Sequence, residues 1–105
     1  MASFRELENS LKSFLIESQS DAHNVKTMAS SRYNNIKISM QPAKLRHKHV
    51  SIKMGISEAT FDLTSFEKIS GGLGFEERFV HRWFERSGIK AKLEDCWNNE
   101  LAKSG

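Results

Sequence analysis

Residues 46–54 read R-H-K-H-V-S-I-K-M and predict a strand that is buried on one side only. The apolar positions are Val50, Ile52 and Met54. The polar positions that alternate with them are His49, Ser51 and Lys53, preceded by His47. This period of two is typical of a half-buried strand. We therefore expect the apolar side to build core, while the imidazoles and the lysine face water or a partner.

A further strand is predicted on each side of this one. Residues 36–41 alternate in the same way, and Pro42 ends that run because proline cannot donate to a ladder. Residues 59–64 form the third run, and the short link beginning at Gly55 favours a hairpin. These features predict a three-stranded antiparallel meander.

Three helices are predicted around the meander. The first spans residues 3–17 and opens with Ser3 and Glu6 at capping-box spacing. The second follows Gly71-Gly72-Leu73-Gly74, which we interpret as a hinge, and runs to Arg86; residues 65–70 are a connector. The third runs from Ile89 to Leu101, with Cys96 and Trp97 on its inner face.

Together these elements predict an α+β fold of two layers, with order α-β-β-β-α-α and the helices on one sheet face. The 105 residues fit a single domain, 1–105. Residues 22–35 are either two turns of helix or a mobile loop. No apolar run approaches the roughly 20 residues of a membrane span, and a single cysteine fits a reducing cytoplasm.

The charge distribution indicates an acidic partner. Residues 22–57 contain no Asp or Glu, yet they carry seven of the 16 basic residues, whereas the rest of the chain is net acidic. A basic middle of this kind fits an acidic protein surface, a nucleoprotein or nucleic acid. Aromatic residues, which usually stack single-stranded bases, are not predicted on the basic sheet face.

Catalytic and metal chemistry have weaker signals. His47 and His49 are two residues apart on one strand, so both could reach a metal, with Asp62 or His23 as a third ligand. Arg46 and Lys48 would repel that cation, and we expect no metal or other cofactor. Asp62 facing His49 is the one acid–base pair that the pattern offers, so we expect no catalytic residues and no enzyme.

From residue 46 onwards the chain resembles a family of small uncharacterised bacterial domains with an H-x-H strand, a hairpin and a helix pair containing a tryptophan. The matching residues are His47-Lys48-His49-Val50, residues 59–63, residues 79–84 and Trp97. Members of that family resemble single-domain partners in toxin–antitoxin-type neighbourhoods. The resemblance implies this fold and an interaction role in a bacterium or phage.

We therefore expect a non-enzymatic binding protein, either monomer or homodimer, whose basic sheet face docks an acidic protein or nucleoprotein. An inhibitor, antitoxin or immunity-like role is its concrete form. Direct nucleic-acid binding is the alternative, and a small metal-dependent enzyme comes third. The expected partner-binding residues are Lys37, Lys44, Arg46, His47, Lys48, His49, Ser51 and Lys53.

Overall fold

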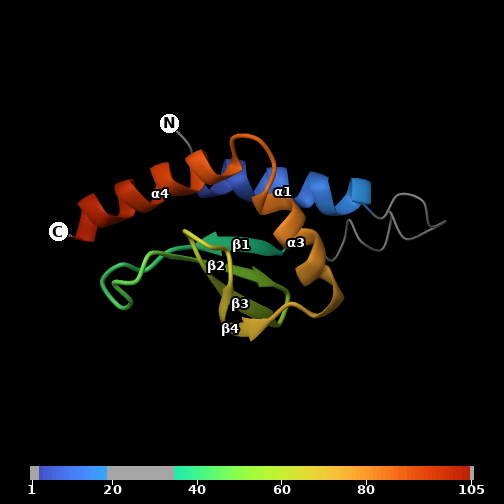
Figure 1. Cartoon of the computed structure of the whole chain (residues 1–105), viewed down its shortest axis with the longest axis horizontal. Coiled ribbons are helices and arrows are strands. Elements are labelled where there is room, and N and C mark those ends of the chain that lie inside the picture. Colours follow the sequence, from blue (N-terminus) through green and yellow to red (C-terminus); the bar gives the residue numbers. More distant parts are fainter. Residues whose placement is uncertain (1–2, 19–34, 105) are drawn as a thin grey trace.

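The computed structural model describes residues 3–18 and 35–104 and has the expected α+β class (Figure 1). The elements in chain order are α1 (Phe4–Ser18), β1 (Ile36–Ser39), β2 (His49–Met54), β3 (Ser57–Asp62), β4 (Lys68–Gly72), the 3₁₀ helix η1 (Gly74–Glu76), α3 (Glu77–Phe84) and α4 (Ile89–Ser104). The segment 22–35, predicted as helix or mobile loop, lies outside the described residues except for Asn35.

The sheet has four strands rather than the predicted three. All neighbours are antiparallel in the order β1-β2-β3-β4, so the meander is confirmed and extended by one strand. The added strand, β4, comes from residues that we predicted to be a connector and a hinge. That prediction was wrong because β4 is exposed on both sides and therefore has no apolar alternation.

Backbone conformation, not hydrophobicity, allows β4 to join the sheet. Gly71 lies opposite Ala59 with a φ of +76°, and a Cβ placed there would lie 2.1 Å from the carbonyl oxygen of Glu58. Only glycine permits so close an approach. The register also shifts beside Phe61, so that Ile69 is an extra residue in β4, as in a β-bulge.

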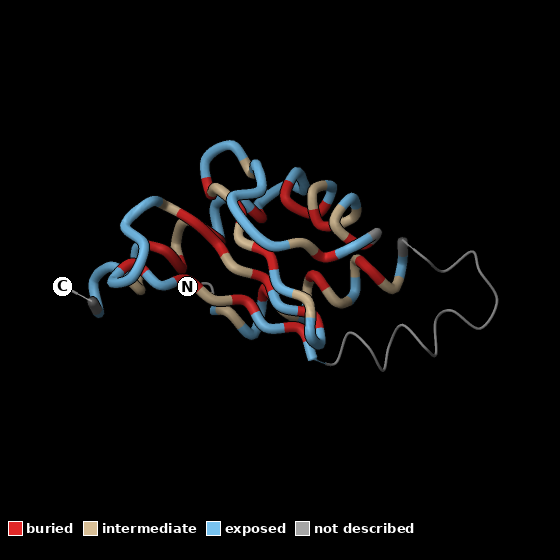
Figure 2. Tube along the Cα trace, turned by 90° about the horizontal axis from the view of Figure 1, so that it is seen from below, coloured by how far each residue is buried: buried red, intermediate tan, exposed pale blue. Residues whose placement is uncertain are grey.

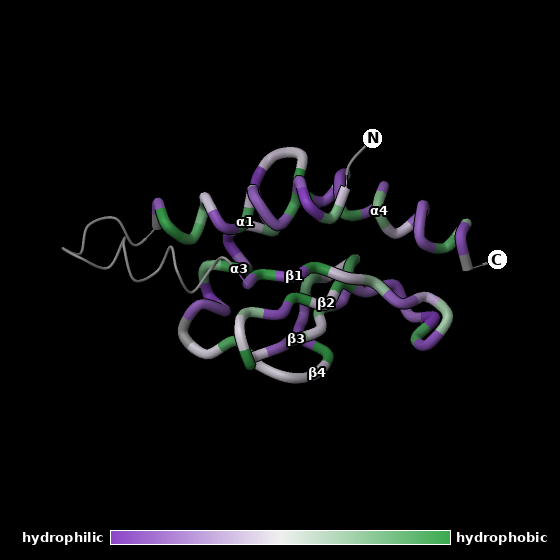
Figure 3. The backbone as a smooth tube through the Cα atoms, turned by 180° about the vertical axis from the view of Figure 1, so that it is seen from behind, coloured by the Kyte–Doolittle hydropathy of each residue, from purple (hydrophilic) through white to green (hydrophobic). Residues whose placement is uncertain are grey.

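One face of the sheet is covered by the helices, as predicted. Burial alternates along β1 and β3, and along β2 from Val50 onwards (Figure 2), and hydropathy follows it (Figure 3). The buried core residues of the three strands are Ile36, Ile38, Val50, Ile52, Met54, Ala59 and Phe61. Those of the helices are Leu7, Leu11 and Leu15 of α1, Val80, Trp83 and Phe84 of α3, and Ile89, Leu93, Cys96 and Trp97 of α4. One apolar cluster therefore joins both layers.

Helix α1 is fixed to the sheet edge as well as to the other helices. Its start is capped as predicted, since the amide of Glu6 donates to Ser3 Oγ at 3.2 Å. Glu8 Oε2 accepts the amide of Ile38, on edge strand β1, at 2.9 Å. Trp83 Nε1 of α3 donates to Ser10 Oγ at 3.1 Å. The outer edge of β1 is thus partly occupied from within the chain.

The close approach of β4 to β3 predicts the effect of a substitution at Gly71. Gly71→Ala will lower the free energy of unfolding by about 2 kcal/mol or more, because strain at positive φ adds to a clash with backbone. Gly55→Ala is the matched control: its φ is +60° but no atom lies within 4 Å of the added Cβ, so about 1–2 kcal/mol is expected. Urea unfolding measures both, and equal losses would contradict the close approach.

Candidate functional site

The uncovered sheet face presents its polar side chains in cross-strand rows. The first row joins Lys37, Lys53 and Glu58. The second row contains only hydroxyl residues, Ser39, Ser51, Thr60 and Ser70, from all four strands. Within this row Ser51 Oγ and Thr60 Oγ1 are 2.9 Å apart and share a hydrogen bond. The face therefore offers cations at one end and hydroxyl groups in the middle.

The predicted cations form two groups rather than one patch. Lys37 and Lys53 are exposed at one end of the face, whereas Lys44 and Arg46 are exposed in the loop between β1 and β2, at the other end. From the row of Lys53 to that of His49 the strand advances four residues, about 13 Å. None of these four cations forms an ion pair within residues 3–18 and 35–104.

Lys48 does not join either group. Its Nζ lies 3.7 Å from Glu94 Oε1 of α4, and both side chains are about one-third exposed. The structure also brings two acids, Glu58 and Asp62, onto the open face through β3. The face is consequently less positive than the acid-free run 22–57 suggests.

The prediction that His49 faces water or a partner was wrong. His49 is only 2 % exposed, and its ring packs edge-on against Trp97 of α4, with 5.3 Å between ring centroids. His49 and Val50 are consecutive and both buried, so the strict alternation breaks at the first residue of β2. An exposed partner-binding role for His49 is thereby excluded in this conformation.

Both ring nitrogens of His49 bind backbone groups. Nε2 accepts the amide of Gln41 at 3.1 Å, and Nδ1 lies 2.7 Å from the carbonyl oxygen of His47. Because an amide only donates and a carbonyl only accepts, the proton must be on Nδ1 and the ring must be neutral. His49 therefore joins the two ends of the β1–β2 loop. The loop also contains a turn in which the carbonyl oxygen of Gln41 accepts the amides of Lys44 and Leu45.

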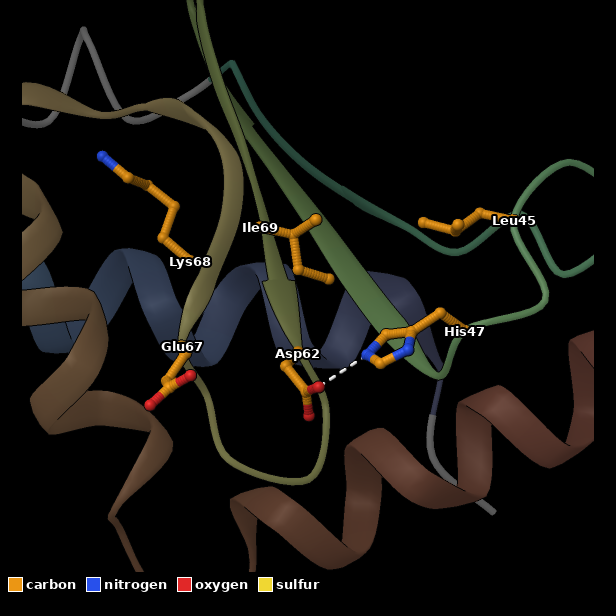
Figure 4. A pocket seen from close by; sticks show the side chains of 6 residues that line it. All are labelled: Leu45, His47, Asp62, Glu67, Lys68 and Ile69. Carbon is orange, nitrogen blue, oxygen red and sulfur yellow. Dashed lines mark hydrogen bonds and ion pairs between the residues drawn. The ribbon is translucent and has the colours of Figure 1, made fainter.

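His47 is the histidine that meets Asp62. The backbone register pairs His49 with Asp62, but the short side-chain contact is 2.6 Å between His47 Nε2 and Asp62 Oδ2 (Figure 4). Asp62 Oδ1 also accepts the amides of Thr64 and Ser65, at 2.6 and 2.9 Å. These donors, led by the Ser65 amide and the His47 side chain, lower the pKa of Asp62 to about 2.

A pocket of about 310 Å³ surrounds this pair. Its lining residues are Leu45, His47, Asp62, Glu67, Lys68 and Ile69. Figure 4 shows Ile69 beside Asp62 and Leu45 beside His47, while the amine of Lys68 points away, where it lies 3.4 Å from Glu77 Oε1. Leu45 and Ile69 are 38 % and 45 % exposed.

Our sequence reasoning did not identify Leu45, Ile69, Glu67 or Lys68 as candidate site residues. Leu45 carries a usable signal, since it is an apolar residue placed between two cations in a loop. Ile69 carries none, because its position depends on the bulge in β4.

The structure separates the two histidines that could have shared a metal. His49 is buried with both nitrogens bound, whereas the His47 side chain is 55 % exposed beside Asp62. Among the residues described, no three His, Cys, Asp or Glu side chains come together as a metal site would require. Cys96 is buried as predicted, and burial, followed by the charge of Asp95, raises the pKa of its thiol.

Comparison of the chain with protein-family models, with curated proteins and with solved structures gave no match. The resemblance to the bacterial H-x-H domains thus stays a prediction. No helix within residues 3–18 and 35–104 is long and apolar enough to cross a bilayer.

The lowered pKa of Asp62 predicts a pH dependence of stability. Ionised Asp62 stabilises the fold fully above its ordinary pKa of 3.8, and this contribution is lost as the pH falls through about 2. Asp62→Asn keeps an oxygen acceptor for the turn but cannot ionise, so the wild type will lose more stability than the variant between these pH values. Urea unfolding across this range measures the difference, with Glu67→Gln as the control that keeps the wild-type slope.

The different environments of the two histidines predict unequal losses of stability when each is removed. His49→Ala will cost about 2–4 kcal/mol, because it leaves a cavity beside Trp97 and a Gln41 amide without its acceptor. His47→Ala will cost less than about 1 kcal/mol, because that side chain is half exposed. Chemical denaturation compares the two, and equal losses would refute the structural role of His49.

Proposed function

We propose that this chain is a binding protein whose open sheet face docks an acidic protein or nucleoprotein surface. The observation that carries the proposal is the placement of Lys37 directly opposite Lys53. Both side chains are exposed, and neither forms an ion pair within the residues described.

This placement is unfavourable for the isolated fold. Side chains directly opposite on neighbouring antiparallel strands have Cβ atoms about 4.5–5.5 Å apart, and like charges there are destabilising. Glu58 is the next residue in the same row, yet it forms no ion pair with Lys53. The repulsion between the two lysines raises the free energy of the unbound protein. An anionic partner would remove this repulsion, and its removal would add to the free energy of binding.

The geometry of the face also restricts the partner. The row of Lys37 and Lys53 lies about 13 Å along β2 from the row of His49, where the loop that carries Lys44 and Arg46 joins the strand, so the carboxylates that bind the two pairs of cations would be well separated. Between them the hydroxyl row can donate to or accept from polar groups of either kind. A protein with two separated acidic groups fits this arrangement, and an inhibitor, antitoxin or immunity-like role is the form of binding that we propose.

Nucleic acid is the alternative partner. Cations and hydroxyl groups are the residues that contact phosphates, and the open face has both. No aromatic side chain of β1–β4 lies on that face, so stacking of bases is not available there. We therefore place the acidic protein first.

Charge reversal tests the proposal. The tagged protein is expressed in its native host, its complex is purified, and the retained molecule is identified and then titrated against variants. The double variant Lys37→Glu/Lys53→Glu should weaken binding by about tenfold or more, whereas Lys90→Glu, an exposed lysine of α4, should change it less than about twofold.

The alternatives give different results. A retained nucleic acid whose affinity falls steeply as salt rises would replace the acidic protein with the second candidate. A partner protein that is insensitive to the Lys37 and Lys53 reversals would contradict docking through this face.

A further inference from the structure

We propose that the pocket around His47 and Asp62 is an anchor site for a peptide segment of the partner, in which an aliphatic side chain is flanked by carboxylates. The inference rests on the proposed function and names the group that would make docking specific. The apolar lining, the cations of the neighbouring loop and the His47 ring each point to one part of that segment.

The walls call for an aliphatic side chain. Leu45 and Ile69 come from different elements, a loop and a bulge, and both leave more than a third of their surface exposed. They line the same pocket, whose 310 Å³ lies at the lower end of the usual range for ligand sites. Insertion of an apolar side chain between them would remove apolar surface from water on both sides.

The loop beside the pocket calls for carboxylates, although its two cations are not among the residues that line the pocket. Leu45 is preceded by Lys44 and followed by Arg46, and both cations are exposed without an ion pair among the described residues. Lys68, on the other side of the pocket, is already engaged by Glu77. Asp62 and Glu67 line the pocket and repel carboxylates, so an acidic segment would place its carboxylates on the loop side, which sets the direction from which the apolar side chain enters.

Besides the Glu67 carboxylate, the His47 ring provides a polar atom of the pocket lining that a peptide can bind. Asp62 binds Nε2 of His47, so Nδ1 is the ring nitrogen that remains for a partner, and it has no hydrogen bond within the residues described. In the neutral ring Nδ1 accepts a hydrogen bond, as from a peptide amide, and in the protonated ring it donates, as to a carboxylate. Either form can bind backbone or side chain of an acidic peptide.

The loop that carries Leu45 and His47 is held in place before any partner arrives. Buried His49 binds the backbone at both Gln41 and His47, and Asp62 holds the His47 ring. A prepared loop loses little conformational freedom on binding, which favours its use as an anchor.

The experiment uses capped peptides of defined sequence as probes. Binding of Ac-Asp-Glu-Leu-Glu-Asp-NH2 is followed by backbone-amide NMR and compared with two controls, one with alanine for the central leucine and one with lysine for every acid. The leucine peptide should bind about tenfold or more tightly than either control, with the largest shifts at residues 45, 47, 62 and 69.

Variants of the protein separate the pocket from general charge attraction. Leu45→Ala/Ile69→Ala should reduce affinity for the leucine peptide by about tenfold, while Ile56→Ala, a fully exposed apolar residue in the β2–β3 turn, should leave it unchanged. Thermal unfolding of each variant confirms that the fold persists.

Two results would overturn the anchor site: equal affinity for the leucine and alanine peptides, or unchanged binding by Leu45→Ala/Ile69→Ala. Neither result would affect docking through Lys37 and Lys53, which is tested by its own charge reversals. Conversely, peptide binding that depends on Leu45, together with a native partner that ignores Lys37 and Lys53, would keep the pocket and reject the open face.

Discussion

The neutral imidazole of His49 is the contact on which the candidate site depends. Its two nitrogens bind backbone groups that are six residues apart in the chain, at Gln41 and His47, while Trp97 covers the ring. Buried polar atoms are costly unless they are paired, so this arrangement is stable only as a complete set. Its result is a loop of fixed shape at the start of β2.

That loop brings His47 to Asp62, and Asp62 in turn shapes the β3–β4 turn at the same end of the sheet. The same carboxylate caps the β3–β4 turn through two amides, and Phe66 in that turn adopts a φ of +62° while its ring stacks on Phe84 at 4.5 Å. Positive φ is unfavourable for an aromatic residue, and stacking on the core offsets part of that cost. Asp62 therefore has a structural role whether or not the pocket binds a ligand.

Both edges of the sheet are protected against pairing with a strand of another chain, so its open face is the surface available to a partner. Glu8 of α1 occupies an outward amide of β1. Strand β4 is short, contains two adjacent glycines and carries the irregular register beside Phe61. Short and irregular edge strands discourage pairing with another chain. The uncovered rows of lysines and hydroxyl groups are thus the more suitable surface for a partner.

The sequence alone was sufficient for the helices, for the first three strands and for the direction in which Val50, Ile52 and Lys53 point, because period and local capping are properties of neighbouring residues. It could not reveal β4, whose place in the sheet depends on a backbone approach between Gly71 and Glu58. Nor could it show that His49 is buried, since a period of two states which way a side chain points but not what covers it. Trp97, far along the chain, covers it, and that contact exists only once α4 has packed on the sheet. The pocket has the same origin: Leu45 and Ile69 have no local relation, and only tertiary structure places them beside His47 and Asp62.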